Sequence, residues 1–193
     1  VGGNWQIKQW LSSYSALAYD SSGITKNSVI KKNSMVSIDA QSSIAPKRIS
    51  KNQRPDFSKP LTVRVLPGPE FDSFSKEFQQ QFLNQSFTLS PQSNRMGFRL
   101  IPELKNLAGP EMISSGVIPG TIQITSSGQP IILLADAQTS GGYPRIANVI
   151  TSDVDALGQL KPGDEVRFVL VGLSDAQVAL AEKQEAFSFL DKA

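Results

Sequence analysis

From Leu61 onward, short apolar segments follow one another along the sequence, separated by turns that contain glycine or proline. Short runs of this kind, bounded by turn residues, are typical of β-strands. We expect strands at residues 62–66, 86–89, 97–101, 117–118, 121–124, 131–135, 145–151 and 165–171. Many short strands with Gly and Pro turns favour a closed or nearly closed β-barrel. The fold class predicted from this pattern is therefore mainly β.

Helical patterns in this sequence are few and short. Phe74, Phe78 and Phe82 are spaced by four residues, which places them on one face of a short helix. We expect this aromatic stripe to lie in the core rather than around a ligand. A second short helix is expected from Asp153, as its N-cap, to Leu160.

The last part of the chain has the composition of a helix, being rich in Ala, Glu, Lys and Gln. Ser174, with Gln177 three residues later, forms a capping-box pattern at its start. We therefore expect a C-terminal helix over residues 175–190. It follows the last expected strand, so it is predicted to pack on the barrel or on a neighbouring molecule.

The stretch from Gln129 to Ile150 combines two apolar segments with a polar connection that contains a glycine pair. Backbone amides at Gly141 and Gly142 can approach a ligand or partner closely. Polar connections between buried strands often hold binding groups on a rigid scaffold. The same residues also suit a plain hairpin turn. From this stretch alone the hairpin is the favoured interpretation, and a binding loop is the alternative.

The sequence contains neither histidine nor cysteine among its 193 residues. Ser-His-Asp and Cys-His catalysis, histidine general bases and the usual zinc sites are therefore excluded for this chain. Any chemistry must use carboxylates, lysine, tyrosine, hydroxyl groups or backbone amides. A mean hydropathy of −0.17 and the lack of an apolar run of membrane-spanning length fit a soluble globular protein. Since no cysteine indicates the compartment, a cytoplasmic location is the default expectation.

Charge is unevenly distributed along the chain. Residues 1–60 carry nine Lys and Arg against three Asp and Glu, whereas residues 61–193 carry ten against fourteen. The basic residues gather between Lys47 and Lys59. A nucleic-acid interface would be expected to interleave them with aromatic residues or to show a recognition-helix motif, and neither is visible. We interpret residues 41–60 as a basic, proline-containing linker.

A second polar segment, Ser93 to Leu100, leads into one of the expected strands. Arg95 and Arg99 could together bind a carboxylate or phosphate through paired hydrogen bonds. In the alternative interpretation, which is favoured without further information, Asn94 closes a turn and Arg99 points outward from the strand. At the end of the strand at 131–135, Asp136 is expected to act as a turn former rather than as a catalytic acid.

Five segments, taken in order, match the motifs of a known family: Thr62–Pro69, Ser93–Leu100, Ser115–Gln123, Gly128–Arg145 and Leu160–Asp164. On these segments the chain resembles the carboxyltransferase-type family. That family includes allophanate hydrolase subunit 2, KipA, the C subunit of 5-oxoprolinase and the carboxyltransferase domain of urea carboxylase. The match covers residues 61–172, with a fainter one over residues 1–40, and the order and spacing of five motifs make it specific.

The resemblance implies a cyclophilin-like β-barrel at residues 61–172, with short helices and a C-terminal helix at 173–193. It also implies that residues 1–40 are the remnant of a preceding N-terminal subdomain, which agrees with a first residue, Val1, that is not methionine. Family members work with a KipI-like partner subunit and a LamB-type subunit. The complex uses ATP, and we expect this chain alone to bind no cofactor and no metal, and to contact neither nucleic acid nor membrane.

Conserved patches of the family fall on two segments of this chain. With the donor Arg145 beside them, they give a candidate substrate-binding set of Asn94, Arg95, Arg99, Gln138, Thr139, Gly141, Gly142, Tyr143 and Arg145. The sequence departs from the family at Ser115, where members usually carry an acid, and in degraded early motifs at 11–16 and 23–26. No catalytic residue is identified.

By this resemblance, the expected function is that of a subunit of an ATP-dependent amide or lactam hydrolase. The match is most like 5-oxoprolinase, which opens 5-oxoproline to glutamate, or allophanate hydrolase subunit 2. Two alternatives remain open. One is a non-catalytic regulatory module that pairs with a KipI-like subunit, and the other is biotin-dependent carboxyl transfer to urea-like substrates. The departures from the family pattern leave open whether the chain is itself catalytic.

Overall fold

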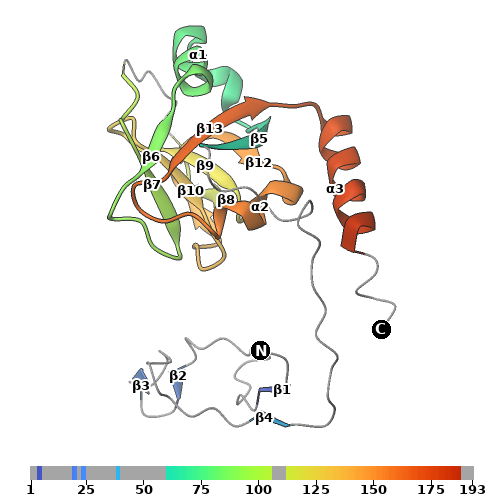
Figure 1. Cartoon of the computed structure of the whole chain (residues 1–193). Coiled ribbons are helices and arrows are strands. Elements are labelled where there is room, and N and C mark those ends of the chain that lie inside the picture. Colours follow the sequence, from blue (N-terminus) through green and yellow to red (C-terminus); the bar gives the residue numbers. More distant parts are fainter. Residues whose placement is uncertain are drawn as a thin grey trace. The chain divides into compact units, whose positions relative to one another are not determined.

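The computed structural model describes residues 60–105 and 112–187 (Figure 1), and four two-residue strands nearer the N-terminus. These strands form two antiparallel pairs, β1 (Asn4–Trp5) with β4 (Ile38–Asp39) and β2 (Tyr19–Asp20) with β3 (Gly23–Ile24). The chain divides into two compact units, Val1–Arg54 and Pro55–Ala193. Apart from these strands, the expected subdomain remnant at 1–40 and linker at 41–60 lie outside the described residues.

In the described part of the second unit, seven strands close into a barrel in the order β10-β7-β6-β13-β5-β12-β9. Neighbours are antiparallel except for the parallel pair β5 and β13. The strands are β5 (Leu61–Pro67), β6 (Phe87–Leu89), β7 (Gly97–Ile101), β9 (Thr121–Ile124), β10 (Pro130–Leu133), β12 (Arg145–Val149) and β13 (Glu165–Leu170). All seven overlap strands that the sequence predicted, and the mainly β barrel is confirmed.

The barrel interior is filled by alternate residues of its strands, as the pleat of a strand requires. Val63 and Val65 of β5, for example, are fully buried, while Arg64 between them is partly exposed. Helix α1 (Lys76–Asn84) adds aromatic side chains to this core, and Figure 1 shows it above one end of the barrel. Phe82 of α1 stacks on Phe168 of β13 with ring centroids 4.8 Å apart.

The phenylalanine stripe lies in the core as predicted, although only part of it is helical. Phe78 and Phe82 belong to α1, whereas Phe74 precedes the helix and follows the 3-10 turn η2 (Phe71–Ser73). Phe74 stacks on Phe78 at 5.0 Å between centroids. Buried Gln79 donates to the carbonyls of Phe71 and Phe74, which fixes the corner between the turn and the helix.

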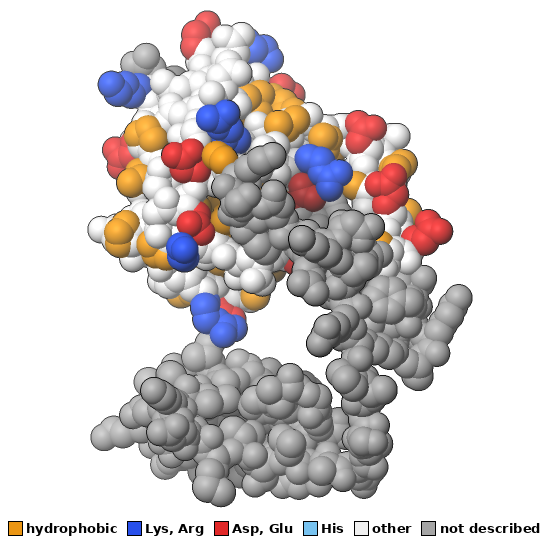
Figure 2. Space-filling model, viewed as in Figure 1, with side chains coloured by type: hydrophobic (Ala, Val, Ile, Leu, Met, Phe, Trp, Pro, Cys, Tyr) orange, Lys and Arg blue, Asp and Glu red, His pale blue; other side chains and the backbone are white. Residues whose placement is uncertain are grey.

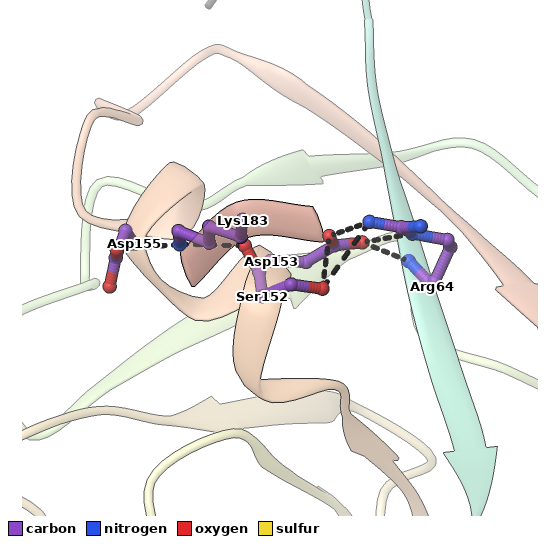
Figure 3. A network of polar contacts seen from close by, with 5 residues as sticks. All are labelled: Arg64, Ser152, Asp153, Asp155 and Lys183. Atoms are coloured by element: carbon purple, nitrogen blue, oxygen red, sulfur yellow. Dashed lines mark hydrogen bonds and ion pairs between the residues drawn. The ribbon is translucent and has the colours of Figure 1, made fainter. Parts of the chain in front are cut away.

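Helices α2 (Thr151–Leu157) and α3 (Leu173–Phe187) follow β12 and β13. They pack on each other, and Figure 3 shows the polar network that joins both to β5. Arg64 of β5 binds Asp153 through two guanidinium nitrogens and its own backbone N–H. Lys183 of α3 donates to the Ser152 carbonyl at 2.8 Å and to Asp155 at 2.7 Å.

The helix starts differ from those expected. Asp153 does not cap α2, because the helix begins at Thr151 and the carboxylate is occupied by Arg64. Ser174 lies inside α3 rather than before it. Asp175 instead accepts a hydrogen bond from the backbone N–H of Gly172. This contact is one half of a capping box that begins at Gly172, two residues before the expected start at Ser174. The expected C-terminal helix is confirmed to Phe187, and residues 188–193 lie outside the described part.

The connection between β10 and β12 is not the hairpin that the sequence favoured. β9 lies between these two strands in the barrel, so the chain from Leu134 to Pro144 crosses over it. Within this crossing, β11 (Ser140–Gly141) pairs with β8 (Ser115–Gly116), two residues before the strand expected at 117–118. The crossing loop therefore covers the outside of the barrel.

Side chains of both charges are interspersed on the face of the barrel seen in Figure 2. In the described part of the chain, no helix is both long and apolar enough to cross a membrane.

Candidate functional site

A pocket of about 200 Å³ lies between the outer face of the barrel and the crossing loop. Its floor is a row of residues on adjacent strands, since Ile131 of β10 lies opposite both Arg99 of β7 and Gln123 of β9. A second row, Gly97 and Leu133, lies beside it. The neighbours of these residues along each strand, such as Phe98 and Ile132, point into the core. Strand pairing therefore brings together side chains that are far apart in the sequence.

The walls of the pocket come from the two polar segments singled out in the sequence. Asn94 and Met96 contribute from the turn before β7, and Gln138 and Tyr143 from the crossing loop. The Asn94 side-chain oxygen accepts the Met96 backbone N–H at 2.9 Å, so this residue shapes the turn as well as the pocket. The Tyr143 side chain is 44% exposed and lies at the border between the pocket and solvent.

The described residues that line the pocket include a positively charged side chain and several amides, but no carboxylate. The only ionisable lining residues in the described part are Arg99 and Tyr143, while Asn94, Gln123 and Gln138 supply amides. A guanidinium binds a carboxylate through paired hydrogen bonds, and primary amides both donate to and accept from a substrate amide. The Arg99 guanidinium is oriented by Gln129, whose side-chain oxygen lies 3.1 Å from Nη1. The arrangement suits a small, polar, anionic ligand.

Gln123 is a polar side chain almost fully enclosed beneath the crossing loop, at 2% exposure. Its Nε2 donates to the Tyr143 carbonyl at 3.0 Å. A Cβ atom at Gly141 would stand only 2.6 Å from that nitrogen, so any larger residue there would displace the Gln123 side chain. Gln123 therefore anchors the loop and lines the pocket at the same time.

The sequence-predicted site residues fall into three groups: those that line the pocket, those in the loop beside it, and two arginines outside it. Asn94, Arg99, Gln138 and Tyr143 line the pocket. Gly141 and Gly142 lie beside it in the loop, and the Thr139 carbonyl is taken by the backbone N–H of Val117 at 3.0 Å.

Arg95 and Arg145 are engaged outside the pocket. The Arg95 side chain is 85% exposed and pairs with Asp136 at 2.7 Å, so Asp136 holds this arginine from the turn that follows β10. Arg145 lies nearly buried against Glu70, with Nη2–Oε1 2.6 Å and Nε–Oε2 2.8 Å. The paired guanidinium holds the pKa of the Glu70 carboxyl below its ordinary value of 4.5, and the carboxylate raises the pKa of Arg145.

Five pocket residues and one ion-pair partner are absent from the predicted site. Met96, Gly97, Gln123, Ile131 and Leu133 line the pocket, and Glu70 holds Arg145. A glutamine inside the apolar strand at 121–124 was the available signal for Gln123. Glu70 directly follows the Pro67-Gly68-Pro69 turn, and an acid placed next to that turn was the only cue.

No group of three or more acidic, histidine or cysteine residues that would suit a metal ion occurs within the described residues. The pocket lining itself offers oxygen and nitrogen from amides, a phenol and a guanidinium. Such a set favours hydrogen bonding to a ligand over coordination of a cation.

The structure thus defines a closed β-barrel protein with a polar pocket on the outside of its barrel. Residues 1–170 match the family model described as "Carboxyltransferase domain, subdomain A and B", and the chain belongs to this family.

Individual relatives fall into two groups. The chain is 43% identical to the C subunit of 5-oxoprolinase from Escherichia coli (strain K12) over 129 residues, which are 66% of this chain and 42% of that protein. It is 27% identical to the urea amidolyase of Lachancea kluyveri over 96% of this chain and 11% of that protein. The crystal structure of the K. lactis urea amidolyase superposes with a TM-score of 0.67 at 26% identity, over 79% of this chain and 10% of that chain. The chain spans less than half the length of each of these relatives.

Proposed function

We propose that this chain is part of a subunit of an ATP-dependent amide or lactam hydrolase, most like 5-oxoprolinase, and that the outer pocket binds the substrate. The observation that carries the proposal is the row formed by Arg99, Ile131 and Gln123 on three adjacent strands. It sets a guanidinium and a primary amide on either side of an apolar side chain. In a five-membered lactam that carries a carboxylate, such as 5-oxoproline, two ring methylenes lie between the carboxylate-bearing carbon and the lactam carbonyl. The pocket, at about 200 Å³, is below the range of drug-sized sites and suits a small molecule.

In this proposal Arg99 binds the substrate carboxylate, and the amides of Gln123 and Gln138 bind the lactam group. Gly141 is paired with Ser115 in the short ladder, so the amide placed near the reacting carbonyl is that of Gly142. Within the described residues the Gly142 backbone N–H donates to no backbone acceptor. A free backbone N–H in this position would stabilise negative charge that develops on the carbonyl oxygen.

The remaining groups for the reaction would come from other subunits. The lining residues of the described chain contain no carboxylate, and a lactam is activated for ring opening by ATP in this scheme. The similar E. coli protein is named as one subunit of its enzyme, which supports a complex. A KipI-like subunit and a LamB-type subunit are the partners we propose, in the cytoplasm, with no cofactor held by this chain alone.

The test is ATP-dependent release of glutamate from 5-oxoproline. The full-length protein is combined with its partner subunits, and a matched preparation omits only this protein. Activity that disappears in the matched preparation supports an essential hydrolase subunit. A stable complex with no activity contradicts the proposal and favours the regulatory module that pairs with a KipI-like subunit.

Carboxyl transfer to a urea-like substrate is the second candidate. It is favoured by the similarity to urea amidolyases, which extends over 96% of the chain, and by the carboxyltransferase family model. Because urea carries no carboxylate, this function would leave Arg99 without its proposed role. Carboxylation of urea by the full-length protein, supplied with a biotin carboxylase, a biotin carrier, ATP and bicarbonate, would select this candidate if no glutamate is released from 5-oxoproline.

A further inference from the structure

The ion pair between Glu70 and Arg145 is the most enclosed of those in the described part of the chain. The side chains are 13% and 18% exposed, and the carboxylate is bound by two guanidinium nitrogens and by the Arg145 backbone N–H at 3.0 Å. Removing two charges from water has a desolvation cost, which such a pair recovers only with very good geometry. A partly buried pair is therefore, by itself, weak evidence for stability.

Two local backbone features bring the two residues together. Gly68 packs so tightly against β12 that a Cβ atom there would clash with the Arg145 carbonyl oxygen, and the Gly68 N–H donates to the carbonyl of Ile146. This contact places Glu70, two residues after Gly68, next to Arg145 at the start of β12. On the other side, the register of β12 against β9 shifts by one residue between Arg145 and Ala147. Irregularities of this kind can change the direction of a side chain.

The guanidinium also contacts the short β8–β11 ladder, which leads into the wall of the pocket. Arg145 Nη1 donates to the Gly116 carbonyl of β8 at 2.9 Å, and Gly116 lies opposite Ser140 of β11 in the short ladder. The ladder leads directly into Gly142 and Tyr143. The ion pair thus holds β8, which pairs with β11 of the crossing loop. Arg145 itself does not line the pocket.

We propose that Glu70 and Arg145 are positioning residues, which fix the β8–β11 ladder and thereby set the Gly142–Tyr143 wall of the substrate pocket. The role of the wall in substrate binding rests on the proposed function. The positioning itself does not, because it concerns only how the loop is held. Arg145 was expected to bind the substrate directly. In this proposal it instead holds the ladder next to the residues that contact the substrate.

The chain supplies a matched control in the pair Arg64 and Asp153 (Figure 3). This carboxylate is also bound by two guanidinium nitrogens, at 2.6 and 3.0 Å, and by the backbone N–H of its arginine at 2.9 Å. The pair has the same chemistry but joins β5 to α2, and neither residue lines the pocket. Any effect of losing a charged pair as such should appear equally in both pairs.

The experiment compares Glu70→Gln and Arg145→Lys with Asp153→Asn and Arg64→Lys, in the full-length protein within the reconstituted complex. The first readout is hydrogen exchange, which needs no substrate. In Glu70→Gln, amides at 113–117 and 138–143 should exchange roughly 10- to 100-fold faster, since local opening follows the lost contacts. In Asp153→Asn the increase should fall in α2 and α3 instead. Unchanged exchange at 138–143 in Glu70→Gln, or an equal increase there in Asp153→Asn, would overturn the proposal.

The second readout is the KM for 5-oxoproline. Glu70→Gln and Arg145→Lys should raise it about 10-fold or more, because a wall displaced by about 1 Å loses its alignment with the substrate. Asp153→Asn and Arg64→Lys should leave it unchanged at temperatures where they remain folded. Faster loop exchange together with an unchanged KM would show that the wall is held as proposed but does not bind this substrate. That result would count against the proposed function and not against the positioning role.

Discussion

Replacing Gly141 with alanine tests the closest approach of the crossing loop to the barrel. The Gly141 backbone is not among the left-handed glycines, so alanine is strained only by what its methyl group meets. That group would lie 2.6 Å from Gln123 Nε2 and 3.2 Å from Oε1. Because Gln123 is enclosed, it must shift and give up its hydrogen bond to the Tyr143 carbonyl.

The magnitude follows from three contributions. Overpacking costs about 1–3 kcal/mol, and loss of the hydrogen bond costs about 1 kcal/mol. Lower chain entropy in the unfolded state offsets about 0.4–1 kcal/mol. We therefore expect Gly141→Ala to lower the free energy of unfolding by about 2 kcal/mol.

The assay is urea denaturation of the full-length protein, followed by circular dichroism. Gly116→Ala is the control, because a Cβ atom at Gly116, in the partner strand of the same ladder, meets nothing within 4 Å. Gly116→Ala should not lower the free energy of unfolding, and the lower chain entropy of the unfolded state should raise it by about 0.4–1 kcal/mol. In a Gln123→Ala background, where the methyl group has room, the cost of Gly141→Ala should largely disappear. Equal costs for Gly141→Ala in both backgrounds would refute the contact as its cause.

Three further substitutions test other parts of the structure. Phe82→Ala removes a fully buried ring stacked on Phe168 and should cost about 3–5 kcal/mol in urea denaturation; a cost below about 1 kcal/mol would contradict its place in the core. Lys183→Ala should change global stability by less than about 1 kcal/mol, since its ion-pair partner Asp155 is exposed, yet hydrogen exchange across α3 should become faster. At neutral pH, Glu70→Gln should be less stable than the parent protein. The pKa of Glu70 is lowered in the folded protein, so its carboxylate contributes fully to the free energy of unfolding above pH 4.5. This contribution is lost as the pH falls through the folded pKa. In acid-unfolding curves, the stability difference between the parent protein and Glu70→Gln should therefore narrow in that pH range.

Much of the barrel could be predicted because strand-forming segments and their turns are local features. The ranges expected for β5, β7 and β9 agree with the structure to within a residue or two. The order of strands is not local, and this is why the connection from β10 to β12 was taken for a hairpin. Only the pairing of β9 with both strands reveals that the loop crosses over it.

The candidate site shows the same limit. The motif resemblance located Asn94, Arg99, Gln138 and Tyr143, which lie together around one pocket. Gln123 could not be assigned, because its contribution depends on the register that sets it across Ile131 from Arg99. The starts of α2 and α3 were also missed. At α2 the expected cap, Asp153, is bound by Arg64, which is distant in the sequence. At α3 a different local pattern, Gly172 with Asp175, is used in place of Ser174 with Gln177.

Assignment of substrate binding to the outer pocket is the central claim, and Arg99 tests it most directly. The measurement is kcat/KM for ATP-dependent release of glutamate from 5-oxoproline, in the reconstituted complex, for Arg99→Ala and Arg95→Ala. Both arginines lie on the same segment, but only Arg99 lines the pocket. We predict that Arg99→Ala lowers kcat/KM about 100-fold or more, as loss of a charge-assisted contact would, and that Arg95→Ala changes it less than about threefold. Equal values for Arg99→Ala and the parent protein, or an equal loss in both variants, would contradict the assignment of this pocket.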